Sequence, residues 1–161
     1  MANYTGADVI TTSDVLKYQP DAFDFGISTT ATETVNFLAQ TTNDILRQLR
    51  VEWWPVYKTN IFTDITVLNT AEMVNTKVNL DQFERAGVYL FLGRFFLPAL
   101  TKFRPETEKD RFERMQEYYM SQYNIEWRMI LEDGVEYDVD SDGTIISNER
   151  EPLHGFRRLT R

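Results

Sequence analysis

Apolar residues recur at the three- and four-residue spacing of an amphipathic helix in three long stretches of the chain. The first stretch predicts a helix from about Thr30 to Trp54, capped by Thr29 or Thr30 and ended by Pro55. Its inward positions are expected to be Val35, Leu38, Ile45 and Leu49, and Thr42 fills a gap in this stripe. Trp53 and Trp54 at its end are interpreted as packing residues, with a ligand platform as the alternative.

The second stretch predicts a helix after Asn79, with Asp81 and Glu84 in a first turn that favours acids. The candidates for inward positions are Phe83, Ala86, Leu90, Phe96 and Leu100. Because apolar residues surround this helix almost completely, it is expected to be central or to face a partner. Pro98 should kink or stop it.

The third stretch predicts a helix from about Glu106 to Asp133, preceded by Pro105 and with Thr107 as a possible cap. Gly134 stands where a left-handed C-terminal cap is wanted. The inward stripe is Phe112, Met115, Tyr119, Tyr123, Trp127 and Ile130. Three such helices predict a small bundle.

The rest of the chain divides into shorter parts. Residues 1–28 are expected to form an extended leader with one short helix, capped at Thr12 or Ser13 and ended by Pro20. Residues 56–78 stay open, because ITVLN suits a strand and TAEMVN suits a short helix. The predicted fold is mainly α: a helical bundle (29–134), a short β-hairpin or EF-type loop (135–149), and extended N- and C-terminal arms, the latter at 150–161.

One motif carries chemistry. After an alternating, strand-like VEYDV, residues 138–149 match every fixed position of the EF-hand loop D-x-[DN]-x-[DN]-G-x5-E. Carboxylates two residues apart on a tightly curling loop can turn toward one point, and Ca²⁺ accepts six to eight oxygen ligands with loose geometry. The candidate metal ligands are Asp138, Asp140, Asp142, the backbone carbonyl of Thr144, and Glu149.

Two residues argue against an ordinary EF-hand. Ile146, at the ninth position, cannot orient a bridging water, and Pro152 follows too closely for a long exit helix. The alternative is a plain acidic hairpin that joins VEYDV to TIIS without metal. A hairpin, however, does not require Glu149 at the last position.

Charge and composition narrow the function classes. The 161 residues carry a formal charge of −8, which disfavours binding to nucleic acid through phosphate contacts. The absence of cysteine excludes disulfides and thiolate sites. The start of the chain lacks the features of a secretory signal, and the most apolar window, 88–100, is too short to span a bilayer, so a soluble protein is expected.

Catalysis is not expected. His154 is the only histidine, and the sequence holds no Gly-rich phosphate loop, HExxH motif or dinucleotide fingerprint. An acid pair for hydrolysis cannot be singled out from sequence. We therefore expect a binding or assembly protein rather than an enzyme.

The order of these elements resembles the head-to-tail adaptor (connector, head completion) proteins of tailed bacteriophages. The residues that carry the resemblance are the leader TTSDVLKYQPDAF, the long helix ending LRVEWWP, and the last helix WRMILEDG running into VEYDVDSDGTIISNE. The resemblance implies a virion protein of the neck, assembled in the host cytoplasm. It implies a ring of twelve copies around the DNA channel, a portal protein above, and a tail or stopper protein below, without catalysis or membrane contact.

The resemblance also implies that the C-terminal arm docks onto the portal. This arm is basic on an acidic body, which suits an acidic groove on a partner. The candidate partner-binding residues are Arg150, Phe156, Arg157, Arg158 and Arg161. The alternatives are a disordered tail and, for the whole chain, a free calcium-binding regulatory module that recruits a target through an apolar face.

Overall fold

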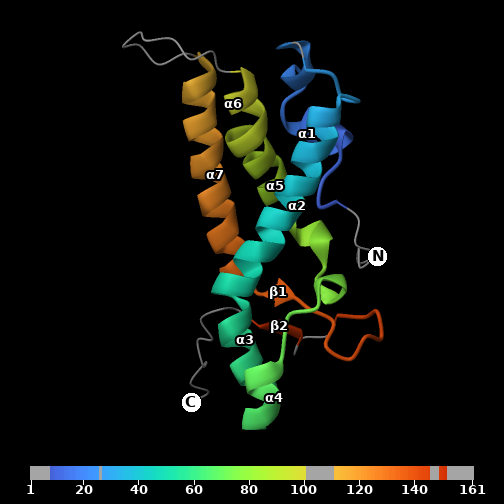
Figure 1. Cartoon of the computed structure of the whole chain (residues 1–161). Coiled ribbons are helices and arrows are strands. Elements are labelled where there is room, and N and C mark those ends of the chain that lie inside the picture. The colour runs from blue at the N-terminus through green and yellow to red at the C-terminus, as the bar shows by residue number, and fades with distance from the viewer. Residues whose placement is uncertain (1–7, 26, 101–110, 146–148, 152–161) are drawn as a thin grey trace. The chain divides into compact units, whose positions relative to one another are not determined.

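The computed structural model describes residues 8–25, 27–100, 111–145 and 149–151 (Figure 1). Its helices are α1 Thr12–Tyr18, α2 Thr32–Glu52, α3 Trp54–Ile61, α4 Ile65–Thr70, α5 Glu84–Leu90, α6 Leu97–Leu100 and α7 Arg111–Asp133. Short 3-10 helices span Ala22–Phe25, Asn75–Lys77 and Leu80–Phe83, and a π-helical turn spans Phe91–Phe96. The strands are β1 Val135–Glu136 and β2 Arg150–Glu151. The prediction of a mainly helical fold is confirmed.

The described residues group into two compact units. The bundle unit comprises those within Asp8–Ile45 and Phe83–Trp127. The loop unit comprises Leu46–Gln82 and the described residues from Arg128 onward. The boundaries at residues 28, 134 and 149 that the sequence suggested stay predictions.

The bundle unit has α5 and the π-helical turn at its centre. Residues 86–93 are all buried. Gly87 lies against Ile45 of α2, the Tyr89 ring lies 6.0 Å from Tyr119 of α7, and Gly93 packs against Met120 of α7. The prediction of a central helix is confirmed within this unit. Pro98 was expected to kink or stop this helix; it lies in α6, directly after a π-helical turn that interrupts the regular α-helix.

The leader takes part in this core. Val9 and Ile10 are buried, and the Val9 backbone N–H donates to Thr42 Oγ1 at 2.9 Å. The short helix α1 confirms the predicted one, but its cap is Thr11, not Thr12 or Ser13. Thr11 is favoured because its side chain accepts the Asp14 N–H while Asp14 accepts the Thr11 N–H, which forms a reciprocal capping box.

Helix α2 begins at Thr32, two residues after its predicted start. Leu38, Ile45 and Leu49 are buried as predicted, but Val35 is 53% exposed, so its inward assignment is wrong. Thr34 occupies that place on the buried face because its hydroxyl donates to the Ser28 carbonyl at 2.8 Å. A satisfied polar side chain therefore replaces the expected apolar one.

Pro55 does not end a helix; it lies in the first turn of α3. Proline is tolerated there because the first helical N–H groups have no intrahelical acceptor. The preceding helix, α2, ends at Glu52. The indoles of Trp53 and Trp54 are both buried. Trp53 stacks on Tyr57 with ring centroids 4.3 Å apart. The packing interpretation of Trp53 is confirmed.

Both assignments left open for residues 56–78 are wrong. The run ITVLN forms α4 rather than a strand, because the Asp64 side chain caps it by accepting the Thr66 N–H at 2.8 Å. After the C-cap Ala71, the chain up to Val74 is not helical. Strand propensity in ITVLN was overridden by this local cap.

The described part of the third predicted helix is α7, and its start at Glu106 with Pro105 and Thr107 lies outside the described residues. Tyr119, Tyr123, Trp127 and Ile130 are buried, while Phe112 and Met115 are half-buried. Gly134 has φ 99°, and its N–H donates to Ile130 O at 3.0 Å, which confirms the predicted C-terminal cap. In the part of the chain that the structure describes, no helix combines the length and apolar character needed to cross a membrane.

Candidate metal centre

The acidic loop is closed at its base by a short antiparallel ladder. After Gly134 the chain enters β1, where Val135 pairs with Glu151 and Glu136 pairs with Arg150. The Tyr137 N–H donates to Glu149 O at 3.0 Å, which extends this closure by one residue. The two ends of the EF-like motif are thereby brought together.

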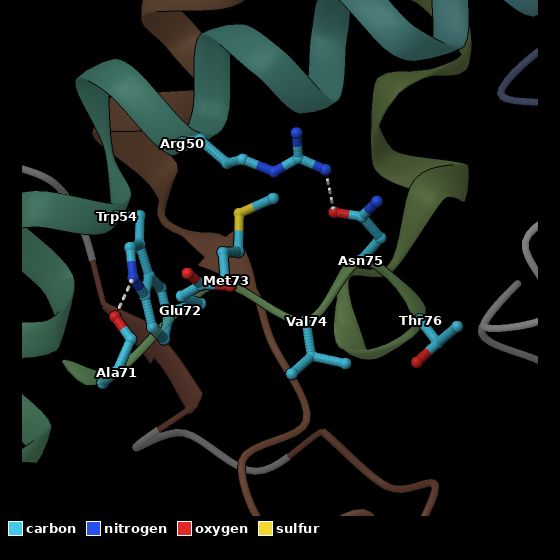
Figure 2. Close-up of a pocket in the computed structure, with 8 residues that line it drawn as sticks. All are labelled: Arg50, Trp54, Ala71, Glu72, Met73, Val74, Asn75 and Thr76. Carbon is cyan, nitrogen blue, oxygen red and sulfur yellow. Dashed lines mark hydrogen bonds between the residues drawn. The ribbon is translucent and has the colours of Figure 1, made fainter. Parts of the chain in front are cut away.

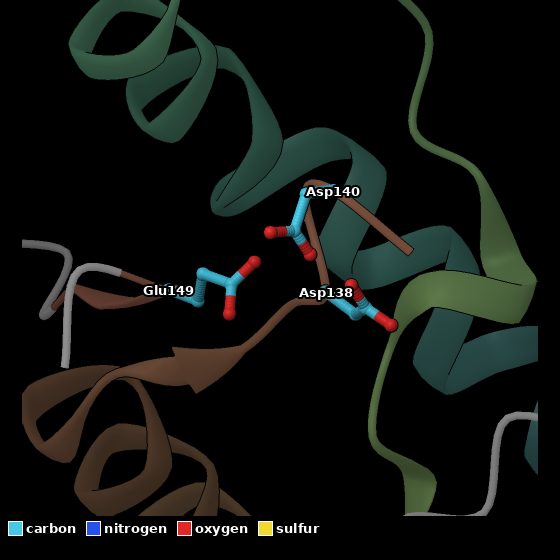
Figure 3. Close-up of side chains that lie close together, drawn as sticks. All are labelled: Asp138, Asp140 and Glu149. Carbon is cyan, nitrogen blue, oxygen red and sulfur yellow. The ribbon is translucent and has the colours of Figure 1, made fainter. Parts of the chain in front are cut away.

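Three carboxylates of the motif converge. The ligand atoms of Asp138, Asp140 and Glu149 all lie within 4.8 Å of one another. Figure 3 shows Glu149 and Asp140 directing their carboxylates toward each other from the two sides of the loop. Asp138 and Glu149 are only 4% and 5% exposed, whereas Asp140 is exposed. Such a cluster could hold a metal ion.

The buried carboxylates of Asp138 and Glu149 accept hydrogen bonds from backbone N–H groups. Asp138 accepts the N–H groups of Ser141 at 2.5 Å and Gly143 at 2.9 Å. Glu149 Oε1 accepts the Val139 N–H at 2.7 Å. Each carboxylate can accept about four hydrogen bonds or metal bonds, so these contacts leave lone pairs for a cation.

Two positive-φ residues make this turn possible. Ser141 has φ 66° and Gly143 has φ 81°. Gly143 occupies the sixth position of the motif, where a sharp turn is needed, and nothing lies within 4 Å of the place where a Cβ would stand. The glycine is therefore required for its backbone conformation and not for space.

Of the four predicted carboxylate ligands, Asp142 is not part of the cluster. Asp142 is exposed, and its Oδ1 accepts the Thr144 N–H at 2.7 Å, which forms a local turn. The backbone carbonyl of Thr144, the fifth predicted ligand, stays a prediction. The structure thus brings together three of the four carboxylates that the sequence singled out, and residues 146–148 lie outside the described part.

A segment that the sequence analysis missed supports the loop. The backbone N–H of Asn79 donates to Glu136 O at 3.0 Å, and the backbone N–H of Asp138 donates to Lys77 O at 2.9 Å. The Lys77 ammonium donates to Val139 O at 2.5 Å, and Asn79 Nδ2 donates to Glu136 Oε2 at 2.5 Å. Lys77 and Asn79 lie in a stretch without a periodic pattern of apolar residues. Their support of the acidic loop therefore becomes visible only from their hydrogen-bond partners in the structure.

Lys77 also lines a cavity of about 390 Å³ beside the loop, together with Thr76, Asp138, Ser141, Asp142 and Gly143. Its ammonium places a positive charge near the acidic cluster. This positive charge would repel a cation bound at the cluster.

Aromatic rings form the floor behind the loop. The Tyr137 ring lies 5.7 Å from Trp53, 5.3 Å from Trp54 and 5.8 Å from Tyr57. Burial raises the pKa of Tyr137, and its hydroxyl accepts the Val74 N–H at 3.1 Å. The residue directly before Asp138 is thus fixed by packing.

A second cavity of about 510 Å³ lies beside this floor (Figure 2). It is lined by Arg50, Trp54 and residues 71–76. The Trp54 indole donates to Ala71 O at 3.2 Å, and the Arg50 guanidinium donates to Asn75 Oδ1 at 2.7 Å. Its lining combines the apolar residues Trp54 and Met73 with the cationic Arg50 and the acidic Glu72.

Of the predicted partner-binding residues, only Arg150 is described. It lies in β2, and its guanidinium Nη1 is 3.5 Å from Glu136 Oε1. Phe156, Arg157, Arg158 and Arg161 lie outside the described residues, as does His154. Arg150 thus belongs to the ladder that closes the loop.

Comparison with known protein families, with curated proteins and with solved structures finds no match to this chain.

Proposed function

We propose that this chain is a virion structural protein, a ring-forming head-to-tail adaptor that sits beneath the portal of a tailed bacteriophage and connects it to the tail. The observation that carries the proposal is the order of elements at the C-terminal end. The last long helix, α7, ends at Asp133 and is capped by Gly134; the acidic loop closed by β1 and β2 follows, and basic residues come after Glu151 in the sequence. This is the part of the sequence on which the resemblance to adaptors is most specific.

The basic segment is the proposed portal contact. After Glu151 the chain carries Arg157, Arg158 and Arg161 with no further acid, whereas the whole chain has a charge of −8. Opposite charge steers such a segment to an acidic groove, and Phe156 supplies an apolar anchor. A tail or stopper protein occupies the other side of the ring.

The acidic composition fits a channel wall. DNA has to slide past the ring without being held, and a surface with excess carboxylate makes few phosphate contacts. We propose that DNA passes through a ring of twelve copies without specific binding.

Calcium is the proposed ligand of the acidic loop. Asp138, Asp140 and Glu149 offer six carboxylate oxygens, which matches the hard, oxygen-rich coordination of Ca²⁺. Because the loop lies between α7 and β2, a bound ion would stiffen the junction from which the basic segment leaves.

The portal contact is tested by gradient sedimentation of the full chain with portal rings of the same phage. The proposal predicts co-migration, which is lost when the chain is cut after Glu151, a position that keeps the β1–β2 ladder intact. Arg157→Glu with Arg158→Glu should also abolish it, whereas Arg128→Glu, an exposed arginine of α7, should not. Wild-type chain that never migrates with portal rings would contradict the proposal.

The acidic cluster also favours a second candidate, a free calcium-binding regulatory module. Such a module exposes apolar surface when Ca²⁺ binds. Fluorescence of a dye that binds apolar surface, measured with and without Ca²⁺, separates the two. An increase favours the module, and no change favours the adaptor.

A further inference from the structure

Two Asp-Gly pairs stand in the sequence, Asp133-Gly134 and Asp142-Gly143. In such pairs an aspartate can isomerise without an enzyme, because glycine has no Cβ to shield the peptide nitrogen that follows the aspartate. That nitrogen can attack the carboxyl carbon, Cγ, of the aspartate side chain. The two pairs differ in how the structure holds the groups that would react.

The reaction needs water as its only co-reactant. The glycine nitrogen forms a bond to Cγ and loses its proton, and the carboxyl group loses one oxygen as water, which closes a five-membered succinimide ring. Water then opens the ring at either of its carbonyls. Opening at the former main-chain carbonyl leaves the glycine attached through the side chain. The product is isoaspartate, which has the same mass and an extra carbon in the main chain.

The first pair is held at a helix end. Asp133 is the last residue of α7, and the Gly134 N–H donates to Ile130 O at 3.0 Å. Ring closure would require this nitrogen to leave its capping bond and Asp133 to leave its helical backbone conformation. The helix therefore suppresses the reaction at Asp133.

The second pair lies in the acidic loop, outside any helix or strand. Asp142 and Gly143 are both exposed, and nothing lies within 4 Å of the place where a Cβ of Gly143 would stand. Asp142 Oδ1 accepts the Thr144 N–H at 2.7 Å, so the side chain is folded back over the Gly143 peptide between them. The Asp142 side chain is thus already close to the nitrogen that would attack it.

One contact opposes the reaction at this pair. The Gly143 N–H donates to Asp138 Oδ2 at 2.9 Å, and Asp138 is only 4% exposed. The nitrogen has to turn out of this bond before it can attack Cγ. It also has to lose its proton beside a negative carboxylate, which like-charge repulsion disfavours. The Ser141 N–H donates to the same carboxylate and helps to hold it in place.

We infer that Asp142 is the residue at which this chain forms isoaspartate, and that Asp138 limits the rate by holding the Gly143 N–H. The inference does not depend on the adaptor proposal or on metal binding. Conversion lengthens the main chain between Asp140 and Glu149, and so it would displace the two sides of the acidic loop relative to each other.

The test follows the purified full chain during incubation at neutral pH and physiological temperature, with a chelator present so that metal ions take no part. Isoaspartate is quantified by enzymatic methylation with isoaspartyl methyltransferase. It is located by electron-transfer fragmentation in a mass spectrometer, which distinguishes it from aspartate of equal mass. We expect product at Asp142 and none at Asp133, and Asp142→Ala should remove it.

Three variants test the role of Asp138. Asp138→Ala removes the acceptor of the Gly143 N–H and should speed conversion at Asp142 about tenfold or more, the factor that corresponds to losing a hydrogen bond to a charged group. Asp138→Asn keeps an oxygen that can accept this N–H, so its rate should stay close to that of wild type. Glu149→Ala removes another carboxylate of the loop but leaves the acceptor of Gly143 in place, so it should not speed conversion.

Several outcomes would overturn the inference. Product at Asp133 instead of Asp142, or no product while a linear peptide of residues 138–145 converts, would show that Asp142 is not the site. An equal rate in wild type and Asp138→Ala would remove the role of Asp138, and a slower rate in the variant would make Asp138 a base that assists the attack. Equal acceleration in Asp138→Ala and Glu149→Ala would show that opening of the loop, and not the Gly143 bond, sets the rate.

Discussion

The bundle unit and the loop unit are each stabilised internally by a different kind of interaction. The bundle unit relies on close apolar packing around α5 and the π-helical turn, with glycines where neighbours approach most closely. The acidic loop of the loop unit relies on side chains bonded to backbone, as in the contacts of Asp138, Glu149 and Lys77. Changes in the bundle should therefore act on folding as a whole, and changes in the loop should act mainly on the site.

The largest effect is expected from emptying the centre of the bundle unit. Phe91 is fully buried and stacks on Phe96 with ring centroids 5.5 Å apart. Phe91→Ala should lower the free energy of unfolding by about 3–5 kcal/mol, measured by urea denaturation. The exposed Val35→Ala should change it by less than about 0.5 kcal/mol. Equal losses in both variants would contradict the packing account.

A smaller loss is expected at Gly87. Glycine to alanine in a helix ordinarily gains up to about 1 kcal/mol. Here a Cβ would stand 2.8 Å from Ile10 Cγ2 and 2.9 Å from Val9 Cγ1, so Gly87→Ala should instead cost about 1–3 kcal/mol. Adding Val9→Ala should restore part of that loss in the same denaturation experiment. A stabilised single variant would show that the contact is looser than described.

In the loop, calcium binding should distinguish the carboxylates that act as metal ligands from the one that does not. Calorimetric titration should show Ca²⁺ binding that is lost in Asp138→Ala and Glu149→Ala, while Asp142→Ala, outside the cluster, keeps most of it. Without calcium, Glu149→Ala should cost about 1–3 kcal/mol, because the Val139 N–H loses its acceptor. No heat with wild type would leave an acidic hairpin closed by hydrogen bonds alone.

The smallest effect concerns pH and lies at the start of the bundle unit. Burial on its own raises the pKa of Asp14, but hydrogen bonds from Lys17 and Thr11 more than offset this, so the pKa lies below the ordinary 3.8. Its contribution to stability is thus present above pH 3.8 and is lost as the pH falls through the lowered pKa. The thermal midpoint of wild type should fall more than that of Asp14→Asn between neutral pH and about pH 3.

Helical periodicity predicted much of the bundle unit. The stripe through Tyr119, Tyr123 and Trp127 and the buried run around Leu90 follow from spacing alone. The inward assignment of Val35 was wrong because Thr34, whose hydroxyl is hydrogen-bonded, takes the place of an apolar residue on the buried face. The spacing of apolar residues carries no information about such hydrogen bonds.

The loop unit was less predictable because local and long-range hydrogen bonds decide it. The motif identified Asp138, Asp140 and Glu149, but it also named Asp142, whose carboxylate turns to the Thr144 N–H instead. The sequence near Lys77 does not predict that its ammonium donates a hydrogen bond to Val139 O, 62 residues away. Similarly, α4 depends on one capping carboxylate, which outweighs the strand propensity of its residues.

We propose above that the chain is a structural part of the neck of a tailed phage. The proposal is tested most directly by electron microscopy of tailed phage particles released from cells that carry the gene for this chain, after labelling with a gold-conjugated antibody against it. The account predicts label at the junction of head and tail, with about twelve copies per particle by quantitative mass spectrometry, as a closed ring requires. Particles that are tailed and infectious but contain none of the chain would contradict it.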